Sequence, residues 1–134
     1  MAGKESKMGS VGNKTPSKLE LMNQSGEYRY HSTTINNLES ISKKGILPSE
    51  KGQFGKGVYF SYNIEDSRQW GKEQAKDNSP VVTLRVANTY LANTDYNDID
   101  NEQGVSLSKI PASELQIRQA GKWISLKQFL RNRK

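Results

Sequence analysis

The stretch that decides the fold is EYRYH, residues 27–31, together with VYFSY, residues 58–62. Aromatic residues at every second position of the first segment predict a strand. In the second segment, a run of apolar and aromatic residues follows a glycine-rich approach, which predicts another strand. The first of these strands ends at His31, the only histidine of the chain.

A helix is predicted between these two strands. Ile35, Leu38 and Ile41 recur at helical spacing and share one face. Thr34 is a suitable N-cap residue before this run, and Gly45 fits the position just after a helix end. The first half of the chain therefore alternates strand, helix and strand.

The remaining elements are predicted from the same kinds of signal. Asn63 can cap a second helix whose first turn carries Glu65 and Asp66, where carboxylates complement the helix dipole. Further on, we expect a strand over 81–86 with an extension toward Leu91 as an alternative, an Asn/Asp-rich loop over 92–104, a strand over 105–110, a hairpin of 115–118 and 122–125 around Ala120-Gly121, and a helix over 126–134. Strands outnumber helices and the helices fall early, so the predicted fold class is α+β with a split, mostly antiparallel sheet.

The N-terminal segment differs in composition from the rest. Residues 1–24 are rich in Lys, Gly, Ser and Asn, which predicts a flexible leader. A short strand or turn formed by Leu19, Leu21 and Met22 can dock on the domain, so the sequence does not fix where the leader ends. Residues 25–134 are expected to form a single domain. A hydrophobic content of 33% over 134 residues fits a polar segment that dilutes a smaller globular unit.

The composition excludes several kinds of site. The chain has no cysteine, which excludes disulfides, thiolate zinc sites and cysteine nucleophiles. A single histidine excludes a multi-histidine metal site, and we expect no metal. No apolar run approaches the roughly 18 residues that a membrane span needs, and the N-terminus lacks the apolar region of a secretory signal. We therefore expect synthesis in the cytosol and no membrane partner.

The net charge of +6 is unevenly distributed along the chain. An acidic stretch lies between Asp95 and Glu102. After Glu114 there is no acidic residue, and the cations there are Arg118, Lys122, Lys127, Arg131, Arg133 and Lys134. A basic end favours nucleic acid, an acidic protein surface or an anionic ligand as partner, and a solvated helix and tail is the plain alternative.

Three features together resemble the H-Y-E branch of the ADP-ribosyltransferases, which includes diphtheria toxin and the PARP enzymes. The first is His31 at a strand end, followed by Ser32-Thr33-Thr34 and an amphipathic helix that leads into Gly45-Ile46-Leu47-Pro48. The second is the segment Gly55-Lys56-Gly57-Val58-Tyr59-Phe60-Ser61. The third is the spacing after Tyr59, because Ser67 lies eight residues on and Trp70 eleven. The resemblance fades after Trp70.

The resemblance implies a role for each of these residues. His31 would hold a hydroxyl of the adenosine-side ribose of NAD+, assisted by Thr33, and the backbone of Ser32 would pair with the nicotinamide amide. Tyr59 and Trp70 would enclose the nicotinamide ring, and Ser67 would hydrogen-bond its amide. The second aromatic position of the family is a Tyr, which this chain replaces with Trp70.

The residue types are physically suited to such a slot. Ser67 and Trp70 are three residues apart on the predicted helix, so they project from one face. If that face packs beside Tyr59, the two rings form a slot whose electronegative faces favour a flat cationic ring such as nicotinamide. Cleavage of the nicotinamide–ribose bond develops positive charge on the sugar, which requires a carboxylate or polar group near the ribose.

The third catalytic residue of the family is a Glu at the start of a late strand, and its position here stays open. Glu102 and then Gln103 are the first candidates, because they precede the predicted strand 105–110. The alternatives in and after the same loop are Asp98, Asp100 and Glu114. A solvated acidic loop accounts for these carboxylates equally well. If Gln103 occupies the position, transfer would be weaker or restricted to particular acceptors.

The expected function is that of a mono-ADP-ribosyltransferase with NAD+ as substrate and a nucleic acid or a protein as acceptor. The resemblance is to small bacterial toxins and effectors, which implies a monomer acting in the cytoplasm, delivery as part of a secreted polypeptide, and a cognate immunity protein. Two alternatives stay open. An RNA 2′-phosphotransferase-like enzyme would need arginines around its phosphate, and Arg29, Arg68 and Arg85 are scattered along the chain. A non-catalytic module that binds NAD+ or nucleic acid would lack a carboxylate near the ribose.

Overall fold

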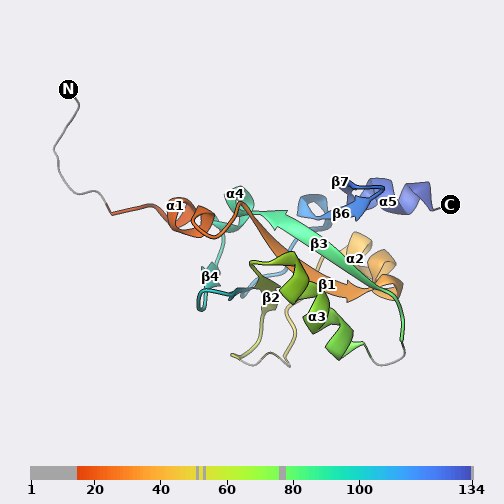
Figure 1. Ribbon diagram of the computed structural model, residues 1–134, viewed down its shortest axis with the longest axis horizontal. Coiled ribbons are helices and arrows are strands. Elements are labelled where there is room, and N and C mark those ends of the chain that lie inside the picture. The colour runs from red at the N-terminus through yellow and green to blue at the C-terminus, as the bar shows by residue number, and fades with distance from the viewer. Residues whose placement is uncertain (1–14, 51, 53, 76–77, 134) are drawn as a thin grey trace, which may run out of the picture.

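The computed structural model describes residues 15–50, 52, 54–75 and 78–133. Helices and strands alternate irregularly along the chain (Figure 1). Their bounds are α1 Lys18–Asn23, β1 Tyr28–Thr34, the 3-10 turn η1 Ile35–Asn37, α2 Leu38–Lys44, β2 Val58–Ser61, α3 Ile64–Gln74, β3 Val81–Ala87, α4 Asn88–Leu91, β4 Tyr96–Asp98, β5 Gln103–Ser106, η2 Ala112–Glu114, β6 Gln116–Gln119, β7 Lys122–Ser125 and α5 Leu126–Asn132.

The strands form one sheet in the order β4-β5-β2-β1-β3-β6-β7, and every neighbouring pair is antiparallel. The predicted α+β class is confirmed. The sheet has two parts of unequal character, because β1 pairs with β3 along its whole length but with β2 only at Tyr30 opposite Ser61. The part β4-β5-β2 and the part β1-β3-β6-β7 therefore meet at a single residue pair.

One face of the sheet packs on the core, and α2 and α5 cover that face. Leu84, Val86 and Ile117 point into it from β3 and β6, and Val58 and Phe60 do so from β2. Helices contribute further large side chains to the core, among them Leu38, Ile41, Leu126 and Phe129. The strict alternation of buried and partly exposed residues along β2 leaves Tyr59 and Ser61 on the opposite side.

Several local predictions are confirmed at the residues that motivated them. The side chain of Asn63 accepts hydrogen bonds from the amides of Glu65 and Asp66 at the start of α3. Gly45 ends α2 with a φ of 77°, a conformation that favours glycine. The turn between β6 and β7 is formed by Ala120 and Gly121, both with positive φ, as the hairpin prediction required.

The predicted leader over residues 1–24 is wrong for its last part. Residues 18–23 form α1, and Met22 is buried in the core at 2% exposure. The helix begins with a reciprocal capping box between Ser17 and Glu20, which satisfies amides that a free end would leave open. Residues 1–14 lie outside the described residues. The folded domain therefore begins at least as early as Ser17.

Other boundaries also differ from the predictions. The alternative extension of the third strand toward Leu91 is wrong, because β3 ends at Ala87 and residues 88–91 form the short helix α4. The predicted loop 92–104 contains β4, and β5 begins at Gln103 rather than at 105. In the first half of the chain, residues 35–37 form a 3-10 turn before α2, and Thr34 makes no side-chain capping bond.

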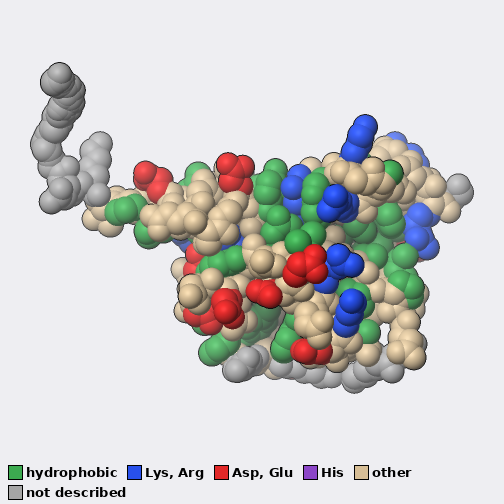
Figure 2. Space-filling view, viewed as in Figure 1, with side chains coloured by type: hydrophobic (Ala, Val, Ile, Leu, Met, Phe, Trp, Pro, Cys, Tyr) green, Lys and Arg blue, Asp and Glu red, His purple; other side chains and the backbone are tan. Residues whose placement is uncertain are grey.

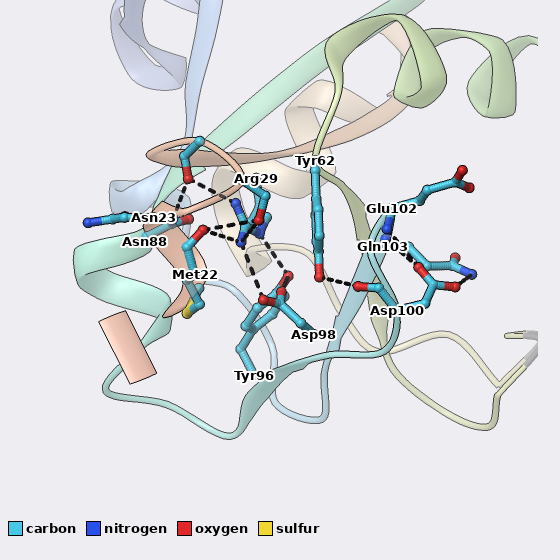
Figure 3. A network of polar contacts seen from close by, with 12 residues as sticks. Met22, Asn23, Arg29, Tyr62, Asn88, Tyr96, Asp98, Asp100, Glu102 and Gln103 are labelled. Atoms are coloured by element: carbon cyan, nitrogen blue, oxygen red, sulfur yellow. Dashed lines mark hydrogen bonds and ion pairs between the residues drawn. The ribbon is translucent and has the colours of Figure 1, made fainter. Parts of the chain in front are cut away.

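A buried arginine ties the N-terminal helix to the sheet (Figure 3). Arg29 on β1 is fully buried and donates to the Tyr96 hydroxyl, to the Met22 carbonyl and to the Asp98 carboxylate. Its guanidinium also lies 4.0 Å from the ring centroid of Tyr62. The guanidinium has five N–H donors in a rigid fork, so one arginine can satisfy groups from different segments of the chain. This contact set holds α1, β1 and β4 together.

No helix within the described part of the chain is long and apolar enough to cross a membrane.

Candidate functional site

A cavity of about 590 Å³ lies where β1 and β2 separate. This volume is within the range of small-molecule sites. The wall combines β1, the segment from the end of α2 to β2, the face of α3 and the start of β5. Its residues are Tyr30, His31, Ser32, Ile46, Leu47, Ser49, Gly52, Gly57, Val58, Tyr59, Phe60, Ser61, Asp66, Ser67, Trp70, Gln74, Glu102 and Gln103.

The ladder between β1 and β3 fixes the direction of each backbone group of β1. At its two ends, the amide of Asn88 donates to the Glu27 carbonyl (2.9 Å) and the amide of Ile35 donates to the Pro80 carbonyl (2.9 Å). Hydrogen-bonded pairs alternate along an antiparallel ladder, so the odd-numbered residues of β1 bond to β3 and the even-numbered residues point toward β2. Ser32 therefore directs its N–H and C=O toward β2, where the register has no partner for it.

His31 occupies the break in the ladder. The Tyr59 carbonyl, which would accept from the Ser32 amide if the pairing continued, accepts a hydrogen bond from the Nδ1–H of His31 at 2.8 Å. A carbonyl oxygen can only accept, so Nδ1 carries the proton and Nε2 of the neutral ring keeps its lone pair. The ring packs edge-on against Phe60, with 5.8 Å between ring centroids. His31 is a residue of the cavity wall, and its Nε2 is thus a hydrogen-bond acceptor on a ring that is held in a fixed position.

The protonation state of His31 follows from its surroundings. Burial lowers the pKa of this imidazole below its usual 6.5, and the hydrogen bond to the Tyr59 carbonyl raises it only in part. Burial disfavours the charged ring because it removes the solvation of the charge. At neutral pH the ring is therefore neutral, and Nε2 is an acceptor.

This shift predicts a pH-dependent stability. Since the pKa of His31 is lower in the folded state, the unfolded chain binds the extra proton first as the pH falls. The free energy of unfolding should be constant above about pH 6.5 and then decrease as the pH falls through the folded-state pKa, with a slope of at most about 1.4 kcal/mol per pH unit. Urea unfolding between pH 7.5 and 5 measures it. His31→Gln should lose this slope, and an unchanged slope in the variant would contradict the assignment.

A chain of hydroxyl groups connects α3 to β1 and β3. The Ser32 hydroxyl lies 2.8 Å from that of Ser67 and 2.7 Å from that of Thr83. Ser67 is 2% exposed and lines the cavity. This arrangement needs a close approach of helix and sheet, and Gly71 allows it because a Cβ there would overlap Ser32 and Val81. Ser67 is thereby held at a fixed depth in the wall.

The helix α3 presents one face to the cavity. The prediction that Ser67 and Trp70 share a face is confirmed, since both line the cavity. Trp70 is 53% exposed and lies toward the solvent. Sequence reasoning missed Asp66 and Gln74, which lie four residues to either side of Trp70 and also line the wall. The i, i+4, i+8 spacing of residues 66, 70 and 74 indicates one helix face, and this pattern could have identified both residues from the sequence.

Tyr59 belongs to the part of the cavity wall that β2 forms. Its hydroxyl donates to the Gly55 carbonyl (2.6 Å) and accepts from the amide of Phe54 (3.0 Å). These bonds fix the ring against the glycine-rich segment that precedes β2. Tyr59 and Trp70 make no ring contact with each other in the described structure. The two rings are therefore separate parts of one cavity wall.

The candidates for the third position fall into two groups. Glu102 and Gln103 line the cavity at the start of β5, and Gln103 pairs with Ser61 on the cavity side of β2. The alternatives do not line it. Asp100 accepts from the amides of Glu102 and Gln103, Asp98 pairs with Arg29, and Glu114 lies in η2.

A chain of polar contacts connects Glu102 to the buried arginine (Figure 3). Tyr62, whose ring covers Arg29, donates from its hydroxyl to the Asp100 carbonyl at 2.8 Å. The amide of Tyr62 also donates to the Glu102 carbonyl at 3.0 Å. The turn that carries Glu102 is therefore fixed on both sides.

Two residues of β1 differ from the expectation for the site. Thr33, expected to assist His31, does not line the cavity, and its hydroxyl accepts from the side chain of Asn37 at 2.8 Å. Thr33 lies on the same side of β1 as His31, but the side chain of Asn37 in η1 engages its hydroxyl, and the structure does not bring Thr33 into the cavity wall. Tyr30 was not expected in the site and lines it.

The charged residues among the described part of the cavity wall are all acidic. Asp66 and Glu102 are its carboxylates, and no Lys or Arg is among the described lining residues. Lys56, which directly precedes the lining residue Gly57, is exposed and lies 3.8 Å from Glu50 in a surface ion pair. A wall of this charge favours a cationic group over an anionic one.

No family model matches the chain, and a search of curated proteins returns no match.

Proposed function

We propose that the protein cleaves the nicotinamide–ribose bond of NAD+ and transfers ADP-ribose to a macromolecule. The observation that carries the proposal is the break in the β1–β2 ladder. It leaves the N–H and C=O of Ser32 directed into a cavity that also holds His31, Tyr59 and Trp70. A carboxamide presents one donor side and one acceptor, which is the complement of a free backbone amide and carbonyl.

The remaining groups suit the other parts of the substrate. The rings of Tyr59 and Trp70 attract the cationic nicotinamide, and Ser67 offers a hydroxyl between them and Ser32. The Nε2 of His31 accepts from a ribose hydroxyl. Because these groups lie on strands and a helix that pack together, they hold the glycosidic bond in one orientation before it breaks.

The chemical step follows from the charge of the wall. The bond from ribose C1′ to the ring nitrogen breaks, and its electron pair leaves with nicotinamide, which becomes neutral. Positive charge develops on the ribose, and the carboxylate of Glu102 stabilises it. A nucleophile of the acceptor then bonds to C1′ and releases its proton to solvent.

The anionic diphosphate of NAD+ fits this cavity less well than the nicotinamide riboside half does. None of the described lining residues is a cation. We place the diphosphate at the open side of the cavity, near the exposed segment that carries Lys56. This arrangement concentrates affinity on the nicotinamide half of the molecule.

The experiment is incubation of the purified protein with NAD+ and chromatographic measurement of released nicotinamide. Trp70→Ala should raise KM about tenfold, because it removes an exposed ring that attracts the cationic substrate. His31→Ala should lower kcat/KM by a similar factor through loss of one hydrogen bond. Leu107→Ala, which truncates an exposed apolar side chain away from the cavity, is the matched control and should be unchanged.

The same experiment distinguishes the alternatives. If the wild type binds NAD+ in calorimetry but releases no nicotinamide, the protein is a binding module. If it neither binds nor cleaves NAD+, the proposed function is rejected. A 2′-phosphotransferase would need arginines at its phosphate, and no arginine is among the described residues of the cavity wall.

A further inference from the structure

A stack of aromatic and cationic side chains lies beside the cavity on the outer face of the sheet. The guanidinium of Arg85 lies 3.7 Å from the ring centroid of Tyr28 and 4.4 Å from that of Trp123. Trp123 also contacts Tyr30, with 6.1 Å between ring centroids. We call the surface formed by Tyr28, Tyr30, Arg85, Arg118 and Trp123 the sheet platform.

The register places these residues on one face. Tyr30 lies opposite Arg85, and Arg118 lies opposite Trp123. The residues between them in sequence, such as Leu84 and Ile117, are buried on the core side. The side chains of the platform are therefore partly or fully exposed on the side away from the core.

The helix α3 covers only one end of this face. It packs where Ser67 bonds to Ser32, which in turn bonds to Thr83, beyond the end of the platform (Figure 1). Tyr30 belongs both to the platform and to the cavity wall. The platform is therefore continuous with the cavity.

Within the part of the chain that the structure describes, no acidic side chain pairs with the cations of the platform. Arg85, Arg118 and the adjacent Lys122 form no ion pair with any described residue. Figure 2 shows Lys and Arg side chains at the β6, β7 and α5 end, Asp and Glu side chains at the α1 and β4 end, and both kinds side by side over α3. Cations that have no acidic partner among the described residues, beside flat rings, match a ligand that has both negative charge and flat faces.

We infer that the sheet platform binds single-stranded nucleic acid and leads it to the mouth of the cavity. Bases stack on the exposed parts of Tyr28, Tyr30 and Trp123, and phosphates lie near Arg118 and Lys122. An acidic protein segment would use the cations but not the exposed parts of the rings. A duplex would hold its bases inside, away from the rings. Single strands alone use both kinds of group.

The role of this strand as acceptor rests on the proposed cleavage of NAD+, whereas its binding does not. In the transfer, a hydroxyl, phosphate oxygen or base nitrogen of the strand bonds to C1′ as the bond to nicotinamide breaks. Nicotinamide leaves neutral with the electron pair, and any proton on the nucleophile passes to solvent. Binding to the platform brings such nucleophiles close to the cavity because Tyr30 is common to both.

The test is fluorescence anisotropy with a short labelled single-stranded RNA of mixed sequence, without NAD+ and over a range of salt. Trp123→Ala should weaken binding about tenfold through loss of a stacking surface. The double variant Arg118→Gln with Lys122→Gln should reduce the slope of log K against log salt by about 0.7 for each charge. Lys127→Gln with Arg131→Gln removes the same charge from exposed positions of α5 and should have a clearly smaller effect.

The outcomes separate this inference from its alternatives. Equal losses in the two double variants, or equal binding of polyglutamate of matched length, would overturn it. If Trp123→Ala does not fold, photo-crosslinking of a 4-thiouridine RNA to the wild type decides, and the crosslinked peptide should contain Tyr28, Tyr30 or Trp123. RNA binding without nicotinamide release would reject the proposed function alone. Nicotinamide release without RNA binding would reject this inference alone.

Discussion

Glu102→Gln is expected to lower the rate of nicotinamide release by about 100-fold to 1,000-fold, with little change in NAD+ binding. The substitution keeps the size of the side chain but removes its charge. Stabilisation of charge that develops only in the transition state acts on kcat rather than on KM. Groups that stabilise such charge typically contribute this much. Single-turnover kinetics with saturating NAD+ measure the effect.

Two matched variants make this prediction specific. Asp66 is the other carboxylate among the described lining residues, and Asp66→Asn should reduce the rate far less because Asp66 lies on α3 rather than at the start of β5. Gln103→Ala tests whether the neutral neighbour occupies the third position. A rate that survives Glu102→Gln but is lost in Asp66→Asn would move the carboxylate to α3. Loss only in Gln103→Ala would assign the role to the amide.

Arg29→Met is expected to lower the free energy of unfolding by about 3–5 kcal/mol, the typical cost of removing one partner from a buried charged network. The change removes one donor each from the Met22 carbonyl, the Tyr96 hydroxyl and the Asp98 carboxylate, and it takes away the buried charge that faces Asp98. Such a loss is a large part of the stability of a small domain. Urea unfolding followed by circular dichroism measures it.

The control for Arg29 is Arg68, whose side chain is 53% exposed and pairs with Glu65 one helical turn away. Arg68→Met should change stability by less than about 0.5 kcal/mol, because exposed ion pairs contribute little. A loss below about 1 kcal/mol for Arg29→Met would mean that water replaces the guanidinium. In that case the network would not hold α1 against the sheet.

The parts of the fold that could be predicted are those with strong local signals. Asn63 before two acidic residues and the Ala120-Gly121 turn between two apolar runs each require a particular backbone conformation. The helix α1 was missed although its capping box, Ser17 with Glu20, is visible in the sequence. Its apolar residues are few, and only Met22 reaches the core.

The elements that could not be predicted depend on tertiary contacts. In β4, Tyr96 is the only apolar residue in a polar segment, and it is buried because Arg29 donates to its hydroxyl. A buried arginine cannot be recognised from one sequence, since arginines are mostly exposed. The short helix α4 follows β3 directly, and its Thr89 and Tyr90 are residue types common in strands, so local propensity permitted a longer strand.

The candidate site was predicted in its residues more fully than in its geometry. His31, Ser32, Tyr59, Ser67 and Trp70 all line one cavity, together with Glu102 and Gln103. What the sequence does not contain is the point where two strands stop pairing, because that depends on register. The position of Thr33 depends on another unpredicted feature, since its hydroxyl accepts from Asn37 in the 3-10 turn η1.

The break in the ladder at Ser32 also affects how the site would respond to mutagenesis. Replacing the Ser32 side chain removes a hydroxyl, but the amide and carbonyl that face the cavity belong to the main chain and remain. An alanine scan at Ser32 would therefore report the loss of the hydroxyl contacts to Ser67 and Thr83, and not the contribution of the main chain to ligand binding. A substitution elsewhere that let β1 and β2 pair further would remove that contribution without changing a single ligand-binding side chain.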